Sequence, residues 1–289
     1  MSERENILFI VEGAKLEPEI INRMAEVYGL RCEISSVCTN IHAIYRQLKK
    51  DDGYSDIILI LREIFYSRLA SLEKNSQVKN RQREIRRTQE DLAKLDRSFS
   101  SVYLVFDSEL HHRSNKDLDV AAVISQNIAE LKEMLEFFNN ETDQGKLYVN
   151  YPMMESYRDC DDFFDNNYRD RLVSLDVLFG RSPEKGYKAL VASRSHSNIH
   201  RDQISKQQFN QLTCMNVFKL NWMKNRIWGK PQYDDFLVLS HQDAILHLEY
   251  NYCHELGAVA VLNTLLFFII DYKGQDFYNH NICQEFLNT

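Results

Sequence analysis

The chain lacks the glycine-rich loops with which many nucleotide-hydrolysing enzymes hold phosphate. Only nine of its 289 residues are glycine and four are proline, and neither a GxxxxGK[ST] nor a GxGxxG segment is present. Such loops supply closely spaced backbone N–H groups that cradle phosphates. ATP hydrolysis by this chain alone is therefore not expected.

Cysteine pairs of the kind that bind zinc are also missing. The six cysteines are scattered along the chain and form no CxxC pair: Cys32, Cys38, Cys160, Cys214, Cys253 and Cys283. This spacing predicts reduced thiols and argues against disulfides and against a zinc site.

An excess of positive charge and a long apolar run are absent as well. The formal net charge is -7, which argues against a protein that coats nucleic acid, although a local basic surface stays compatible with it. The most apolar stretch, residues 262–270, is too short to span a bilayer and is expected to be a buried helix or a subunit contact. The first residues are polar and acidic, unlike a secretory signal. We therefore expect a cytoplasmic protein without membrane contact.

Two apolar runs that end in acidic residues are the most informative feature present. Residues 7–11 precede Glu12, and residues 101–106 precede Asp107 and Glu109. Such runs predict buried strands of a parallel sheet, whose carboxyl ends meet at one edge. Three carboxylates there repel one another unless a cation joins them, and their oxygens suit Mg²⁺ or Mn²⁺. If the chain stays extended, His111 lies on the same side and is a further candidate ligand.

The alternation of strands and helices predicts an α/β fold with a doubly wound sheet. Further strands are expected over residues 31–37, 56–61 and 147–150, and helices over residues 16–28, 41–50 and 119–139. From residue 157 onward, helical patterns dominate, over residues 161–176, 203–227, 234–247 and 255–271.

A charged insertion, residues 67–97, interrupts this alternation. It has no glycine or proline, and its apolar residues recur every seven positions, so it predicts one long helix or a helical hairpin. Arg83, Arg86 and Arg87 make its middle basic, which indicates a surface for nucleic acid or a partner; the alternative is a solvated helix. At about 1.5 Å per helical residue, this surface is expected tens of Å from the carboxylates. A second basic segment, residues 181–201, predicts a loop that either guides a phosphate backbone or is simply solvated.

Val11-Glu12-Gly13 and Asp107-Ser108-Glu109 resemble the two motifs of the Toprim domain, shared by topoisomerases, DnaG-type primases, OLD-family nucleases and small RloB-like proteins. The family carries a glutamate, usually followed by glycine, after its first strand and Asp-x-Asp after a later one. Here glutamate takes the last place of the second motif. The resemblance covers roughly residues 5–155. It implies a Toprim-like sheet in residues 1–156, with the insertion at about 66–98, and a mainly helical region in residues 157–289.

The resemblance also implies a function. A stand-alone Toprim unit implies a metal-dependent nuclease that hydrolyses phosphodiester bonds of DNA or RNA, tRNA among them, with Glu12, Asp107 and Glu109 holding Mg²⁺ or Mn²⁺. In some relatives the first glutamate is instead a general acid or base. A loose match to RloB-like proteins adds Glu155 as a fourth catalytic carboxylate, and Toprim nucleases add an acidic residue at Glu17. Such nucleases occur as effectors of anti-phage defence systems, some controlled by a partner ATPase.

Other roles stay open for the same residues. Glu17 and Glu155 are also what the N-terminus of a helix favours on electrostatic grounds. Lys15 is a candidate phosphate contact or a solvated lysine. The glutamate at position 109 favours the alternative of a non-catalytic Toprim-like interaction subunit of a larger complex. A phosphatase with Asp107 as nucleophile is a third possibility, although that class needs Asp-x-Asp after the first strand, where Glu12 stands.

Overall fold

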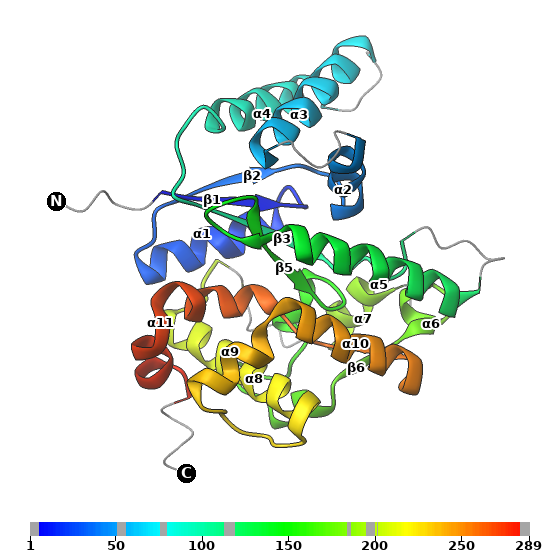
Figure 1. Cartoon of the computed structure of the whole chain (residues 1–289), viewed down its shortest axis with the longest axis vertical. Helices are drawn as coiled ribbons and strands as arrows, with labels where there is room; N and C mark the ends of the chain where they lie inside the picture. The colour runs from blue at the N-terminus through cyan, green and yellow to red at the C-terminus, as the bar shows by residue number, and fades with distance from the viewer. Residues whose placement is uncertain are drawn as a thin grey trace.

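The computed structural model describes residues 6–50, 56–75, 80–112, 119–183, 186–194, 200 and 202–283. Its centre is a five-stranded sheet of order β2-β1-β3-β5-β4, parallel except for β4 (Figure 1). The strands are β1 (Ile7–Val11), β2 (Cys32–Ser36), β3 (Ser101–Asp107), β4 (Asn139–Asn140) and β5 (Gly145–Asn150). The predicted α/β fold with a mostly parallel sheet and a helical C-terminal region is confirmed.

The sheet is built from runs that are apolar on both faces. Every residue of β1 is buried, as expected for a central parallel strand of aliphatic and aromatic residues. Val11 at the end of β1 pairs with Val105 of β3, so the carboxyl ends of the two strands lie at one edge. After β1, the chain adds β2 on one side of it and then β3 on the other side, so the order in which strands are added reverses between β1 and β3. In open α/β sheets, ligands bind in the crevice at such a reversal.

Helices flank the sheet. Those in the N-terminal half are α1 (Leu16–Tyr28), α2 (Ile41–Lys50), α3 (Ile57–Lys74), α4 (Arg81–Lys94) and α5 (Val120–Phe137). Gly29, at φ 69°, ends α1 in the left-handed conformation that glycine adopts readily. One face of the sheet is covered from the C-terminal region, where the ring of Phe268 packs edge-on against Phe9 and Tyr103, at centroid distances of 4.9 and 4.8 Å.

The strand expected over residues 56–61 is wrong, because these residues begin α3. The side chain of Asp56 accepts a hydrogen bond of 2.8 Å from the Ile58 N–H and caps the helix. Ile57, Ile60 and Leu61 are buried on one helical face. A short apolar run has the same pattern in a buried strand and in the first turns of a buried helix, so periodicity could not separate the two.

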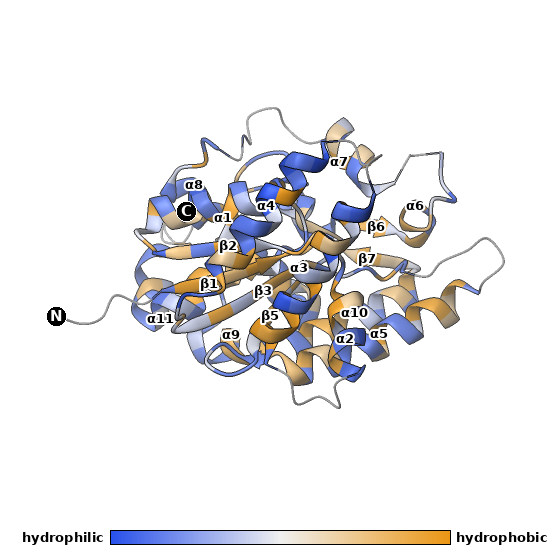
Figure 2. Ribbon diagram, turned by 90° about the horizontal axis from the view of Figure 1, so that it is seen from above, coloured by the Kyte–Doolittle hydropathy of each residue, from blue (hydrophilic) through white to orange (hydrophobic). Residues whose placement is uncertain are grey.

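The insertion is a helical hairpin formed by α3 and α4 (Figure 1). The expectation that its basic middle stands tens of Å from the carboxylates is wrong. Arg87 donates from Nη2 to the Ala14 carbonyl at 3.0 Å, and Lys94 donates from Nζ to the Ile34 carbonyl at 2.8 Å. Helix α4, coloured mostly hydrophilic in Figure 2, is therefore fastened to β2 and to the loop after β1.

The C-terminal region contains α6 (Leu175–Leu178), α7 (Tyr187–Arg194), α8 (Lys206–Asn225), α9 (Tyr233–Ser240), α10 (Gln242–Leu256) and α11 (Phe268–Asn281), with β6 (Leu172–Ser174) and β7 (Ala258–Ala260). Three short 3₁₀ helices accompany them, η1 (Met154–Arg158), η2 (Asn166–Asp170) and η3 (Thr264–Phe267). The helix expected over residues 203–227 is confirmed as α8. Those over residues 161–176 and 255–271 are wrong, because each contains one strand of the antiparallel β6–β7 pair. The loop expected over residues 181–201 contains α7.

This region is joined to the carboxyl end of β5. Tyr151 and Leu262 exchange both backbone hydrogen bonds at 2.9 Å. Thr264 donates from its hydroxyl to the Val149 carbonyl, and Asn263 donates from Nδ2 to the Met154 carbonyl. The end of β5 and the segment after it are therefore held by buried polar contacts from a distant part of the chain.

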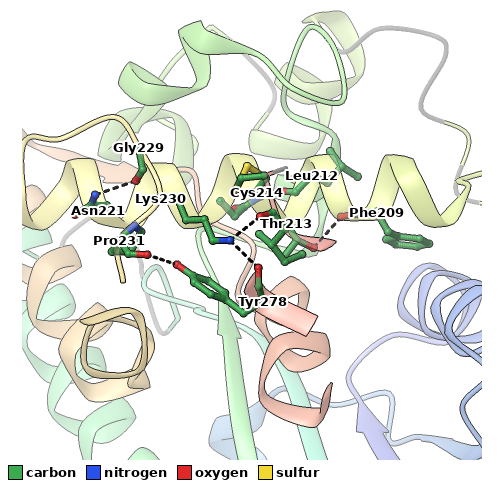
Figure 3. The surroundings of a disulfide bond; sticks show 12 residues. Phe209, Leu212, Thr213, Cys214, Asn221, Gly229, Lys230, Pro231 and Tyr278 are labelled. Carbon is green, nitrogen blue, oxygen red and sulfur yellow. Dashed lines mark hydrogen bonds between the residues drawn. A yellow bond between two sulfur atoms is a disulfide. The ribbon is translucent and has the colours of Figure 1, made fainter. Parts of the chain in front are cut away.

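The cysteine prediction is wrong for two residues. Cys214 in α8 and Cys283 after α11 form a disulfide, whose surroundings appear in Figure 3. Beside it, Lys230 donates from Nζ to the carbonyls of Tyr278 and Ile282. Cys32, Cys38, Cys160 and Cys253 are free thiols. Since the two bonded cysteines are 69 positions apart, their spacing in the sequence did not indicate a disulfide.

Among the described residues, no helix is both long enough and apolar enough to cross a bilayer. Residues 262–270 are buried within η3, α11 and the segment before them.

Candidate metal centre

Three carboxylates meet where β1 and β3 end. One oxygen from each of Glu12, Asp107 and Glu109 lies within 4.8 Å of the other two. Asp107 is buried, and the two glutamates are partly exposed. The structure thus brings together the three residues that the two strand ends predicted, at the reversal in strand order where ligands bind in α/β sheets.

Asp107 is held by the backbone of the segment that follows β5. Its Oδ1 accepts a 2.7 Å hydrogen bond from the Met154 N–H, while the following Ser108 donates from its hydroxyl to the Pro152 carbonyl at 2.9 Å. Asp107 also pairs with Asn150 in the β3–β5 register. One carboxylate oxygen therefore has a fixed backbone partner, which orients the other.

Glu109 has left-handed backbone geometry, with φ at 47°. For a residue other than glycine this conformation costs about 1 kcal/mol, and such residues are concentrated at functional sites. The chain turns here, because the His112 N–H donates to the Glu109 carbonyl at 2.7 Å. The extended alternation expected to bring His111 beside the carboxylates is therefore wrong. The neighbouring His112 ring instead stacks on His42, at a centroid distance of 4.4 Å.

Glu17 holds the loop that carries Glu12. Its Oε1 accepts a hydrogen bond of 3.1 Å from the Gly13 N–H, and its side chain is buried. A Cβ atom on Gly13 would lie 2.3 Å from Glu17 Oε2, so the Glu17 carboxylate can keep this position only beside a glycine. On the other side of the loop, the Cys38 N–H donates to the Glu12 carbonyl at 2.9 Å. Glu17 thus has a structural contact at the site that sequence reasoning did not foresee.

Glu155, in η1, is the fourth predicted carboxylate, and it also lies at the site. It is buried, and its charge acts on Asp107. Lys188 of α7 reaches it from 33 positions further along the chain, with Nζ 3.4 Å from Glu155 Oε1. Lys188 belongs to the basic segment, residues 181–201, for which the sequence left open a phosphate guide or a solvated loop. Its position beside the carboxylates depends on how α7 packs, which no local pattern encodes.

Burial and mutual repulsion weaken the acidity of this cluster. Burial, then the charges of Glu109 and Glu17, raise the pKa of Glu12 to about 7. Burial, then the charges of Glu12 and Glu155, raise the pKa of Asp107 well above its usual range. Glu12 Oε2 and Glu155 Oε2 are buried and accept no hydrogen bond from the part of the chain that the structure describes.

Lys188 responds to the same charges in the opposite sense. Partial burial alone would lower the pKa of its ammonium group, but Glu155, Asp107 and Glu17 together raise it. Lys188 therefore stays protonated beside the cluster at neutral pH.

The four predicted nucleic-acid contacts lie on α4 and the loop after β1. Lys15 is exposed just before α1. Arg87 contacts the neighbouring Ala14. Arg83 is exposed, and the Arg86 side chain is 82% exposed in an ion pair with Glu90. The structure thus brings Arg87 next to Lys15, although 72 positions of sequence separate them.

Comparison with protein-family models, curated proteins and solved structures found no match to this chain. The two strand-end motifs and the geometry of the residues around them are therefore the features that bear on function.

Proposed function

We propose that this protein is a metal-dependent phosphodiesterase of the nuclease type, with Mg²⁺ or Mn²⁺ held by Glu12, Asp107 and Glu109. The observation that carries the proposal is the convergence of these three carboxylates within 4.8 Å at the carboxyl edge of the sheet. The resemblance of the same residues to the Toprim motifs supports it.

The donor set fits a hard divalent cation. All the ligand atoms are carboxylate oxygens, which Mg²⁺ and Mn²⁺ prefer. Glu12 Oε2 is buried and lacks a hydrogen-bond donor among the described residues, and a buried anionic oxygen is costly unless a positive charge compensates it. Burial first, and then the neighbouring carboxylates, raise the pKa values of Glu12 and Asp107, so a positive charge at this place would stabilise both anions. A bound divalent cation would supply that charge, activate water and stabilise the charge on the attacked phosphate.

The remaining residues of the site would orient the substrate. The Lys188 ammonium is a point charge suited to a phosphate oxygen, and Glu155 holds it beside Asp107. Glu17 fixes the Gly13 loop and thereby the position of Glu12. By resemblance alone, the proposal extends to an effector of an anti-phage defence system, with a partner ATPase.

The test joins a metal titration to a hydrolysis assay. We expect Mg²⁺ or Mn²⁺ to raise the Tm of the wild type, since ligand at a hundred times its Kd stabilises by about 2.7 kcal/mol. Asp107→Asn keeps an acceptor for the Met154 N–H but removes the charge, so its Tm should rise much less and its activity on DNA, tRNA and ribosomal RNA should be lost. Glu136→Gln is the matched control, because Glu136 is an exposed acid on α5.

Two results would contradict the proposal. An equal metal-induced rise in Tm for Asp107→Asn and the wild type would locate the metal elsewhere. A normal metal response without hydrolysis of any phosphodiester would instead favour the non-catalytic interaction subunit.

A further inference from the structure

The basic face of α4 begins at the loop that follows Glu12. Arg87 donates to the carbonyl of Ala14, two residues after Glu12. Lys15 follows at once and is exposed. Positive charge from the hairpin and from the β1 loop therefore meets at the loop that carries Glu12, although the two segments are far apart in sequence.

Helix geometry continues this surface outward. Arg83 lies four residues before Arg87 and three before Arg86, so the three side chains share one face within about one turn, or 5.4 Å. Arg83 is exposed, and Arg86 is 82% exposed. The Arg86–Glu90 pair is a surface ion pair, which contributes only about 0.5 kcal/mol. Arg86 can therefore exchange Glu90 for a phosphate at little cost.

The combination of a cationic face and an acidic centre indicates one class of ligand. The chain carries a net charge of -7, so this local concentration of arginine and lysine stands out from the rest of its composition. An acidic protein partner would be attracted to the face but repelled by the carboxylates at its end. A polynucleotide is a repeated phosphodiester. One of its links can therefore lie at the metal centre while neighbouring phosphates lie along the helix.

We infer that Lys15, Arg83, Arg86 and Arg87 form one phosphate-binding track, which holds a polynucleotide backbone along α4 and leads it to the carboxylates. This inference rests on the proposed function and names its substrate class. Phosphate contacts of this kind position a strand without reading its sequence. Arg87 has two roles here, since it also fixes the Gly13–Ala14 loop.

The test is the salt dependence of oligonucleotide binding by the full chain. A labelled single-stranded DNA and a labelled single-stranded RNA are titrated in EDTA, which prevents metal-dependent cleavage. The slope of log K against log salt is negative, and each lost phosphate contact lowers its magnitude by about 0.7. We expect Arg83→Gln/Arg86→Gln to lower it by about 1.4. The matched control, Lys132→Gln/Lys224→Gln, removes the same charge from exposed lysines of α5 and α8 and should keep the wild-type slope.

The outcomes separate this inference from the proposed function. An unchanged slope in the α4 variant, or an equal loss in the control, overturns the track. A wild type that binds neither oligonucleotide also overturns the track. If that protein still hydrolyses the small diester bis(p-nitrophenyl) phosphate with Mg²⁺, the proposed phosphodiesterase function is retained. The expected change in slope, found in a protein that hydrolyses no diester, supports the track and contradicts the proposed function.

Discussion

The carboxylates of the site have structural contacts beyond the cation they are proposed to bind. Asp107 accepts from the Met154 N–H and Glu17 accepts from the Gly13 N–H. Both bonds join the acidic residues to loops that follow strand ends. The site is therefore shaped by backbone contacts within the chain itself.

At Gly13, these contacts are sensitive to an added side chain. Gly13→Ala adds a Cβ that would lie 2.3 Å from Glu17 Oε2, so the Glu17 carboxylate must move and its bond to the Gly13 N–H is lost. We expect the free energy of unfolding to fall by about 1 kcal/mol, the contribution of a typical hydrogen bond. Chemical denaturation of the metal-free protein measures it.

A double-mutant cycle tests the stated cause. In a Glu17→Ala background the clash is absent, so Gly13→Ala should have almost no further effect on stability. Equal losses from Gly13→Ala in both backgrounds would show that Glu17 is not what requires glycine at this position.

The site residues that the sequence predicted are placed by local strand patterns, and those it did not predict are placed by tertiary packing. Glu12, Asp107 and Glu109 were predictable because each follows a buried parallel strand, and strand ends of one sheet meet at an edge. Lys188 and the Arg87–Ala14 contact depend on how α7 and α4 pack, which the local pattern does not encode. The left-handed turn at Glu109, which excluded His111, likewise has no sequence signal.

At the scale of elements, α10 is joined to β7 through a fully buried carboxyl group. Glu249 of α10 accepts a 2.9 Å hydrogen bond from the Ala260 N–H. Burial raises the pKa of Glu249 to about 8, although the Ala260 N–H and Lys219 oppose the shift. Burial also lowers the pKa of Lys219 to about 8. Below that pH, the lysine is thus protonated in both the folded and the unfolded chain.

This shift predicts a pH dependence of stability. Glu249 ionises near pH 4.5 when unfolded and near pH 8 when folded, so the folded state binds more protons in between. The stability it contributes is complete below pH 4.5 and is lost as pH rises toward 8, at up to about 1.4 kcal/mol per pH unit. Glu249→Gln keeps an acceptor for the Ala260 N–H, and its stability should fall less steeply across this window.

Denaturation curves of the two proteins between pH 5 and about pH 7.5 provide the measurement, since that range lies between the two pKa values of Glu249. The titrating groups that do not interact with Glu249 are shared and cancel in the difference, whereas Lys219 loses the Glu249 charge that raises its pKa. Parallel pH profiles for the wild type and Glu249→Gln would mean that Glu249 is ionised in the folded protein throughout the range.

The elements that were predicted correctly have a clear local pattern. The strands β1 and β3 and the helices α1, α5 and α8 show long apolar periodicity or a continuous buried run. Residues 56–61 were mistaken for a strand because a run of six residues is too short to show helical period. Strands β6 and β7 have three residues each and pair across 86 positions of sequence, so only the tertiary fold defines them.

At the scale of the whole molecule, the disulfide closes a long loop of the C-terminal region (Figure 3). Its two cysteines are 69 positions apart, and the loop contains α9, α10, β7 and α11. The same loop contains Asn263 and η3, whose first residue is Thr264, and these two residues hold the end of β5 and the segment after it. The disulfide therefore closes a loop that includes residues in contact with β5 and with the segment that follows it, next to the candidate site.

Removing this closure should destabilise the protein. For a loop of this length, the chain-entropy model gives a contribution of about 4 kcal/mol, and engineered variants often show less. We expect Cys214→Ser/Cys283→Ser to lower the Tm, and a reductant to lower the Tm of the wild type but not that of the variant. Cys32→Ser, at a free thiol, is the control. Equal Tm values in the wild type with and without reductant would indicate that the bond contributes nothing.

The hydrogen bond from Arg87 to Ala14 connects the hairpin directly to the loop that carries Glu12. Thermodynamic linkage then imposes a reciprocity between two binding events. If a strand on α4 changes the affinity for the cation, the cation must change the affinity for the strand by the same factor. A metal centre and a helical arm that look separate along the chain would in that case share one binding equilibrium.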